Sequence, residues 1–237
     1  RLGQGPHFVV EGDEYDTAWF DKGPKFLHYA PQAAIINNVE FDHADIFADL
    51  DHVIAAFAKF ASLVPAGAPL LIPEGDANAA RAVAGVAARV VTFGLDSGTW
   101  RAEQVRREPG RFRFLLTKDG YAMGEFATPV LGLHNLKNTV ATLALLFEID
   151  AITPDLPRAL EGFPGVRKRQ EIKGVADGVT VIDDFAHHPT AVRETIRAVR
   201  TAWPLARVIA LFEPESNTSR RAVFQAEYAE AFAAADE

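Results

Sequence analysis

The sequence predicts an α/β protein with parallel sheets, and three features of its pattern support this. Short apolar runs alternate with longer segments of helical period along the 237 residues. Most of these runs are continuously apolar, which is typical of strands covered by helices on both faces. Polar side chains directly follow several of the runs, at the strand ends where ligands collect in open parallel sheets. We therefore expect a ligand-binding α/β protein of more than one domain.

Composition limits the class of protein. The formal net charge of −8 argues against non-specific binding to nucleic acids. We find neither a secretory leader nor the ~20 consecutive apolar residues that a membrane helix needs, and we expect a cytoplasmic protein. Because the chain has no cysteine, a metal site must use oxygen or imidazole ligands. Magnesium is therefore the default ion.

The expected elements follow in chain order. Helical spacing of apolar residues over 50–60 ends at Pro65 and Gly67, and a second helix covers 136–147. A short antiparallel insertion lies between 99 and 130, with a turn at KDG (118–120). The strands are expected at FVVE (8–11), AAIINNV (33–39), APLLIP (68–73), RVVTFG (89–94), VTVIDDF (179–185) and RVIALFEP (207–214). Both ends of the chain lie inside predicted elements, so we expect part of a longer protein.

Acidic or imidazole groups follow three of these strands. Glu11 ends the first, Asp42 and His43 follow the second, and Asp183 and Asp184 end VTVID. Aspartate after a strand often caps the next helix, and a lone histidine is often a half-buried structural residue. A carboxylate that ends an apolar strand, such as Glu11, has no such capping role. The stretch DDFAHH, taken alone, suits a metal hydrolase as well as a nucleotide-binding turn.

Two further segments combine polar groups in patterns that suit a nucleotide. GLHNLKN (132–138) places His134, Asn135 and Asn138 in the first turn of a helix, and the two amides share a face. An amide offers both donors and acceptors, as a purine edge requires. RKRQE (167–171) is either a solvated hinge or a phosphate clamp. Taken in isolation, the first segment is better explained as a helix cap with further polar residues on the exposed side of the helix.

Together these motifs resemble the Mur ligase family, whose members use ATP to join an amino acid or peptide to a UDP-muramyl carboxylate. The resemblance implies an ATPase-type central domain over residues 1–168, built on a parallel sheet and N-terminally truncated, so that it lacks its phosphate loop. Residues 169–237 would begin a Rossmann-like C-terminal domain. The resemblance runs from about Phe8 to the last residue, through VVEGDEYD, INNVEFDHAD, GLHNLKN, RKRQE and DDFAHHPTA.

The resemblance also implies cofactors and roles. ATP and Mg²⁺ are expected, with Glu11 and His43 as catalytic metal ligands, although a neutral imidazole is an unusual ligand for magnesium. No phosphate loop of the form GxxxxGK[ST] occurs in these residues. The residues expected at the nucleotide are His134, Asn135, Asn138, Arg169 and Asp184. The residues expected at the other substrates are His187, His188, Ser216, Asn217 and Thr218.

The segments EYDTAWFDKGPKFLHY, VEFDHADIF and EPESNT are similar to the corresponding segments of one family member in particular. That enzyme attaches the murein tripeptide L-alanyl-γ-D-glutamyl-meso-diaminopimelate to UDP-N-acetylmuramate in peptidoglycan recycling. An alternative within the family adds L-alanine alone to the same nucleotide sugar. Outside the family, the alternatives are a metal-dependent hydrolase or phosphoesterase and a non-catalytic fragment that binds nucleotide sugars.

Overall fold

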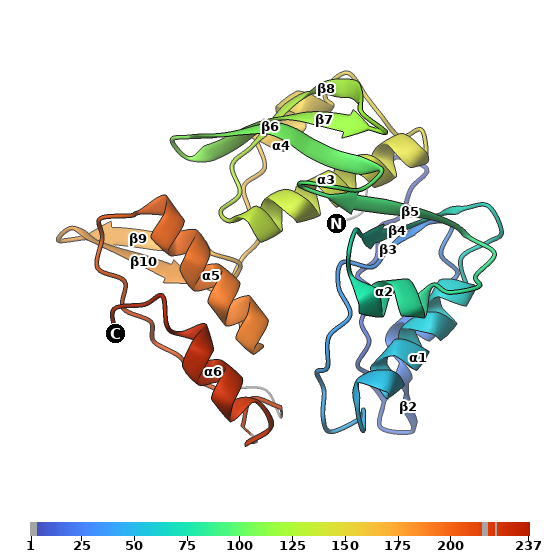
Figure 1. The fold of residues 1–237 in the computed structure, drawn as a ribbon, viewed down its shortest axis with the longest axis horizontal. Coiled ribbons are helices and arrows are strands. Elements are labelled where there is room, and N and C mark those ends of the chain that lie inside the picture. The colour runs from blue at the N-terminus through green and yellow to red at the C-terminus, as the bar shows by residue number, and fades with distance from the viewer. Residues whose placement is uncertain (1–3, 215–217, 221) are drawn as a thin grey trace.

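The computed structural model describes residues 4–214, 218–220 and 222–237 and contains a six-stranded sheet flanked by helices (Figure 1). Neighbouring strands are parallel from β3 to β6 and antiparallel from β6 to β8. In spatial order the strands are β3 (Ala34–Ile35), β4 (Pro69–Pro73), β5 (Arg89–Gly94), β6 (Trp100–Glu108), β7 (Arg111–Lys118) and β8 (Tyr121–Thr128). The predicted α/β class, with a mostly parallel central sheet, is confirmed.

Strand β4 is buried on both faces, as its continuous apolar run predicted. Its successive side chains point to opposite faces of the sheet. Leu70 and Ile72 belong to one buried cluster, whereas Leu71 belongs to the other. The helices of this part are α1 (Leu50–Ser62), α2 (Ala77–Ala82), α3 (Leu133–Glu148) and α4 (Leu156–Glu161). Helices α1 and α2 contribute to the first cluster and α3 to the second.

Local sequence explains where several elements begin and turn. Helix α1 starts at Asp49, whose carboxylate accepts a hydrogen bond from the His52 amide at 2.9 Å. The turn between β7 and β8 places Asp119 and Gly120 at φ 50° and 84°, as a tight hairpin requires. The predicted helices at 50–60 and 136–147 and the antiparallel insertion are confirmed.

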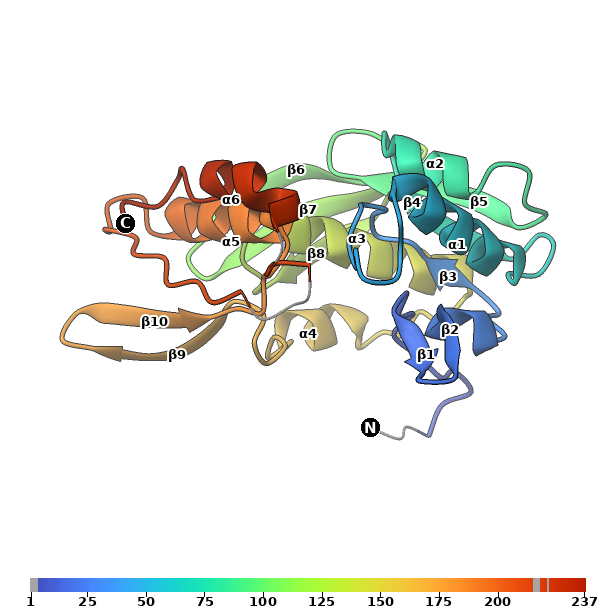
Figure 2. The same ribbon diagram turned by 90° about the horizontal axis from the view of Figure 1, so that it is seen from below.

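A smaller hairpin and the C-terminal segment complete the described chain. Near the N-terminus, β1 (Asp16–Ala18) pairs with β2 (Asp21–Pro24), and the 3₁₀ turn η1 (Lys25–His28) follows. The C-terminal part contains β9 (Glu171–Ala176), β10 (Val179–Asp183), α5 (Pro189–Ala202), η2 (Ala222–Phe224) and α6 (Gln225–Ala231). Figure 2 shows α5 and α6 on the same side of the β9–β10 hairpin.

Three strand predictions need correction. Residues 8–11 form no strand, and Phe8 and Val9 are 79% and 93% exposed, because no described strand lies beside them to pair with. Strand β3 is shorter than predicted and covers only two residues. Residues 207–214 also form no strand, since Val208 and Ala210 pair instead with the backbone of residues 236–237.

Strand β10 lies at the predicted position, but its partner differs from the expectation of a parallel sheet. It pairs antiparallel with β9, because the Asp177–Gly178 turn makes this local hairpin easy to form. Among the described helices, none is both long and apolar enough to span a membrane.

Candidate functional site

Most of the predicted site residues fall into two groups. Each group lies where the N-terminal part of the chain contacts the C-terminal part. We call the first the loop site: the loop 40–45 after β3, Glu14, and the C-terminal residues that contact the loop, which are His187, His188, Thr190 and Thr218. We call the second the hinge site: the first turn of α3, residues 168–170 and Asp184. Both sites contain side chains from the N-terminal part (residues 4–161) and from the segment that follows it.

At the loop site, His43 meets a carboxylate, but not the expected one. Its Nε2 lies 2.9 Å from Oε1 of Glu14, and its ring packs edge-on against Tyr15 with centroids 4.9 Å apart. Glu11 is exposed, and it makes no hydrogen bond or ion pair with any residue that the structure describes. The role of Glu14 could have been proposed from the acidic run EGDEYD, but the sequence could not show which carboxylate reaches the imidazole.

Two properties of His43 favour a functional role. Its backbone has φ 53°, in the left-handed region that costs a non-glycine residue energy and is concentrated at functional sites. Burial disfavours the imidazolium, but the hydrogen bond to Glu14 and the charges of Asp42 and Asp45 outweigh burial and raise the pKa of His43. His43 therefore holds a proton, or binds a cation in its place, more readily than an ordinary histidine.

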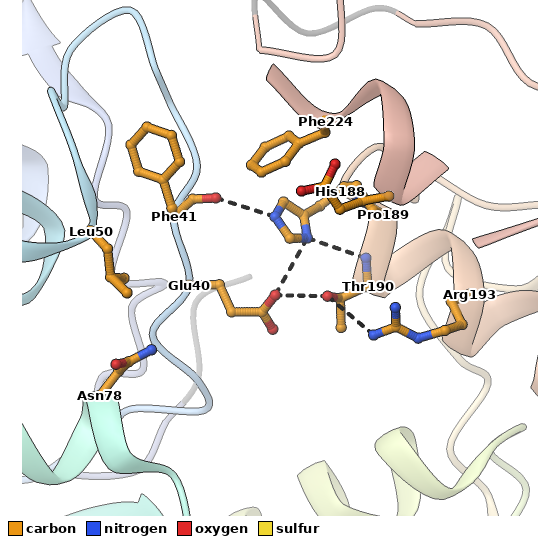
Figure 3. Close-up of a pocket in the computed structure, with 10 residues that line it drawn as sticks. Glu40, Phe41, Leu50, Asn78, His188, Pro189, Thr190, Arg193 and Phe224 are labelled. Atoms are coloured by element: carbon orange, nitrogen blue, oxygen red, sulfur yellow. Dashed lines mark hydrogen bonds and ion pairs between the residues drawn. The ribbon is translucent and has the colours of Figure 1, made fainter. Parts of the chain in front are cut away.

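The C-terminal part closes over this loop from the other side (Figure 3). His188 donates from Nε2 to the Phe41 carbonyl at 3.2 Å, and the Thr190 hydroxyl donates to Oε2 of Glu40 at 2.7 Å. The Ala44 amide donates to the Thr218 hydroxyl at 3.0 Å. These contacts bring residues about 150 positions apart in sequence into one interface.

A cavity of about 290 Å³ lies within this interface. Its wall combines the rings of Phe41 and Phe224 with the charged groups of Glu40, Arg193 and Glu227. Figure 3 shows Glu40 and His188 approaching each other from the two sides. The cavity is therefore formed jointly by the two parts of the chain.

The histidine pair lies at this interface. His187 approaches Asp42 at 3.9 Å, and His188 caps α5 by accepting the Thr190 amide at Nδ1. Since Nδ1 accepts, the proton of a neutral His188 is on Nε2, where it reaches Phe41. Thr218 is buried, whereas Ser216 and Asn217 lie outside the described residues. Contact of these side chains with substrates remains a prediction.

At the hinge site, one residue that the sequence did not single out joins the predicted ones. Gln170 is 7% exposed and has φ 51°. Its side chain donates to Nε2 of His134 and accepts from the Asn135 amide, both at 3.1 Å. Its backbone amide donates to Asp184 at 3.1 Å, and Asp184 also accepts from Thr195. Only its place beside Arg169 in RKRQE could have drawn attention to it.

His134 is held neutral at this site. Burial lowers its pKa, and the nearby charges of Glu194 and Asp184 only partly oppose that effect. Because Nε2 accepts from Gln170, the proton of the neutral ring is on Nδ1, which is buried and has no hydrogen-bond partner among the residues that the structure describes. This orphaned donor is a polar group that a rearranged or ligand-bound site could satisfy.

Close packing brings the two parts of the chain together next to His134. Gly132 has φ 80°, and a Cβ added there would lie 2.7 Å from the Cβ of Ala198 on α5. Only glycine therefore lets the start of α3 approach α5 this closely. The hinge site is assembled by backbone contact as well as by hydrogen bonds.

The residues of the loop site and the hinge site agree only in part with the expected ligands, magnesium and a nucleotide. Across residues 4–214, 218–220 and 222–237, no three His, Asp or Glu side chains are grouped to hold a metal ion. Magnesium is commonly held by one or two carboxylates together with waters and substrate phosphates, and Glu14 beside His43 could supply one such ligand. For a nucleotide, Asn138 is exposed in the second turn of α3, and Arg169 stacks over Phe185 at 5.6 Å.

Family comparisons agree with this arrangement. The family model of the Mur ligase middle domain matches residues 7–146, and that of the Mur ligase glutamate ligase domain matches residues 168–237. Exact domain boundaries remain a prediction.

Two curated relatives illustrate the similarity. A UDP-N-acetylmuramate–L-alanyl-γ-D-glutamyl-meso-2,6-diaminoheptandioate ligase of Escherichia coli (strain K12) is 39% identical over 100% of this chain and 52% of its own length. A UDP-N-acetylmuramate–L-alanine ligase of Caldanaerobacter subterraneus subsp. tengcongensis is 34% identical over 100% of this chain and 50% of its own. The chain thus spans about half the length of the curated relatives it matches.

Solved structures share the fold. A murein peptide ligase from Psychrobacter arcticus 273-4 superposes with a TM-score of 0.69 at 31% identity, covering 97% of this chain and 47% of that one. A UDP-N-acetylmuramate–alanine ligase from Thermotoga maritima gives a TM-score of 0.71 at 24% identity, covering 92% and 49%, a likeness of fold alone. With both family models and these relatives in agreement, the chain belongs to the Mur ligase family.

Proposed function

We propose that the full-length protein containing this chain is an ATP-dependent ligase that joins L-alanyl-γ-D-glutamyl-meso-diaminopimelate to UDP-N-acetylmuramate. The observation that carries the proposal is the Escherichia coli relative, which is 39% identical across the whole chain and has this specificity in its name. A corresponding name belongs to a 36% identical relative from Haemophilus influenzae. We place the reaction in peptidoglycan recycling and in the cytoplasm.

The chemistry requires two anions to approach each other. The γ-phosphate of ATP moves to the lactyl carboxylate, and the peptide amine then attacks the acyl phosphate and releases phosphate. Magnesium, when bound, neutralises charge between the carboxylate and the triphosphate. Within this chain, Glu11, Glu14 and His43 are the groups we assign to that region, and the raised pKa of His43 suits an anionic environment.

The hinge site would hold the nucleotide. Asn135 and Asn138 lie on one face of α3, and the side-chain Nδ2 of Asn138 lies 3.5 Å from Oδ1 of Asn135. Asp184 would hold the nucleotide, but its carboxylate already accepts from Gln170, Thr195 and Ala186. Binding through Asp184 therefore requires an exchange of these hydrogen bonds.

Within the family, L-alanine is the alternative third substrate. Relatives named UDP-N-acetylmuramate–L-alanine ligase reach 37% identity, so identity alone separates the two specificities narrowly. Outside the family, a metal-dependent hydrolase would gather the acidic and imidazole motifs around its ions. In the described part of the chain those motifs instead divide between the loop site and the hinge site.

A coupled assay for ADP tests this proposal on the full-length protein. We expect ADP only when UDP-N-acetylmuramate and the tripeptide are both present. The matched comparison uses L-alanine in place of the tripeptide. A higher kcat/KM with L-alanine than with the tripeptide would show that the protein has the other specificity. Release of phosphate from a simple phosphoester without ATP would support the hydrolase.

A pair of carboxylate variants tests the metal assignment. Glu11→Gln removes a charge from the proposed magnesium site and should lower kcat about a hundredfold. Asp16→Asn is the control, because Asp16 pairs with Lys22 within the β1–β2 hairpin and not with His43. Near-normal turnover by Glu11→Gln at saturating magnesium would give Glu11 a surface role and leave Glu14 as the carboxylate to test next.

A further inference from the structure

The loop 40–44 has two neighbours at once. On one side, His43 contacts Glu14 and Tyr15 of the N-terminal part. On the other side, the C-terminal part contacts the loop from the start of α5, from Thr218 and from Phe224, whose ring lies 6.1 Å from that of Phe41. The loop is thus the physical link between the proposed catalytic histidine and the C-terminal part.

Regular secondary structure does little to hold this loop. Strand β3 ends at Ile35 and α1 begins at Leu50, so the residues between them belong to neither a helix nor a strand. His43 also adopts a left-handed backbone conformation, which other contacts must maintain. The amides of Ile46 and Phe47 donate to the His43 carbonyl, but these bonds stay within the loop. Anchoring must therefore come from outside it.

We propose that Thr190, at the start of α5, is a positioning residue that holds the loop so that His43 faces Glu14. Its hydroxyl donates to the Glu40 carboxylate at 2.7 Å, a hydrogen bond strengthened by the charge of the acceptor. This inference rests on the proposed function, because it gives the C-terminal part a role in setting the geometry of the catalytic histidine.

The start of α5 is well suited to this task. His188 caps the helix through Nδ1 and uses its Nε2 proton on the Phe41 carbonyl, so one side chain joins helix and loop. The Glu40 carboxylate lies 3.5 Å from Nδ1 of His188, near a helix N-terminus, where negative charge is stabilised. Thr218, outside α5, adds a further anchor at Ala44. Movement of α5 away from the loop would break the bonds of His188 and Thr190 together.

Three variants separate positioning from general stability. Thr190→Val removes the hydroxyl at nearly constant volume, and Thr190→Ser retains it. Thr201→Val is the matched control, since Thr201 lies exposed on the same helix and its hydroxyl bonds only within the helix, to the Arg197 carbonyl. Equal thermal midpoints would show that all three variants fold.

The first readout is hydrogen exchange over residues 40–47 in the protein without substrates. We expect faster exchange of this segment in Thr190→Val, and wild-type rates in Thr190→Ser and Thr201→Val. The second readout is kinetic: Thr190→Val should lower kcat about tenfold, as loss of one hydrogen bond to a charged group predicts, with little change in KM for ATP. Thr190→Ser should restore kcat.

Unchanged exchange of 40–47 in Thr190→Val would overturn the inference, and so would faster exchange with an unchanged kcat. A wild-type protein that makes no ADP with both substrates would instead refute the proposed function. In that case the exchange measurement still decides whether Thr190 holds the loop. Failure of the inference and failure of the proposed function are therefore distinguishable.

Discussion

The N-terminal part and the C-terminal part of the chain are built in different ways. In the N-terminal part, the sheet has a large buried core, and Trp100, Phe93 and Leu71 are at most 1% exposed. In the C-terminal part, a small buried cluster joins α5 to α6 around Ile196. Four apolar side chains of the β9–β10 hairpin remain more than half exposed: Ile172, Val175, Val179 and Val181.

This difference indicates what maintains each part. The N-terminal part has a large apolar core, whose burial is the dominant stabilising contribution in a folded domain. The C-terminal part depends more on polar contacts with its neighbour, at Gln170 on one side and at Thr190 on the other. Variants that destabilise one part at a time can test this difference.

The largest effect is expected in the N-terminal core. Trp100 is 1% exposed, and its ring packs against Phe147 with centroids 5.2 Å apart. Trp100→Ala should lower the free energy of unfolding by about 3–5 kcal/mol, measured by denaturant titration. Trp19→Ala is the control, because Trp19 is 90% exposed and should change that free energy by less than about 0.5 kcal/mol. Equal losses in the two variants would contradict the contrast.

A charged group in the same part gives the next largest effect. Glu148, at the end of α3, has a side chain only 3% exposed and accepts from Trp100 while pairing with Lys118 and Arg89. Glu148→Gln should cost about 1–3 kcal/mol at neutral pH, because it leaves those donors poorly satisfied. Glu125→Gln, on the exposed side of β8, should be close to neutral.

The pH dependence of stability tests the same residue. Burial by itself would raise the pKa of Glu148, but the hydrogen bonds from Lys118, Trp100 and Arg89 outweigh burial and lower it. A lowered folded-state pKa contributes stability above the ordinary value of 4.5 and loses it as the pH falls through the lowered value. Denaturant titrations below pH 4.5 should therefore show a shallower loss for Glu148→Gln than for wild type. Parallel curves would contradict this assignment.

The smallest effect is expected in the C-terminal cluster. Ile196 on α5 and Ile72 on β4 are similarly buried, at 6% and 5% exposed, so the same substitution can be compared in both parts. Ile→Val typically costs about 0.5–1.5 kcal/mol. We expect Ile72→Val near the upper end, and Ile196→Val near the lower end because fewer buried residues surround it. In the second variant, faster hydrogen exchange should be confined to α5 and α6; exchange that spreads into the central sheet would contradict the contrast.

Sequence patterns predicted the N-terminal part better than the C-terminal part, for a physical reason. Strand β4 is buried on both faces, so its apolar run predicted its structure directly. The equally apolar runs at 8–11 and 207–214 form no strands, because strand formation needs a partner that the run itself does not specify. A local Asp-Gly turn likewise decided the pairing of β10.

The candidate sites show the same limit. The motifs predicted that His43 and Asp184 belong to polar sites. In the structure each lies beside a polar partner, as expected for residues that follow strands. The motifs did not identify Glu14 as the partner of His43 or Gln170 as the residue between His134 and Asp184. Both assignments depend on contacts between segments 29 and 36 residues apart, which spacing along the chain does not reveal.

The most direct test of the proposed chemistry follows an oxygen atom. In an acyl-phosphate mechanism, the lactyl carboxylate of UDP-N-acetylmuramate keeps one oxygen in the amide and gives the other to phosphate when the amine attacks. With both carboxylate oxygens labelled as ¹⁸O, mass spectrometry of the phosphate released by the full-length protein should show one ¹⁸O per molecule. Phosphate without ¹⁸O would show that water, and not the lactyl carboxylate, attacks the γ-phosphate, and it would contradict the proposed ligase chemistry.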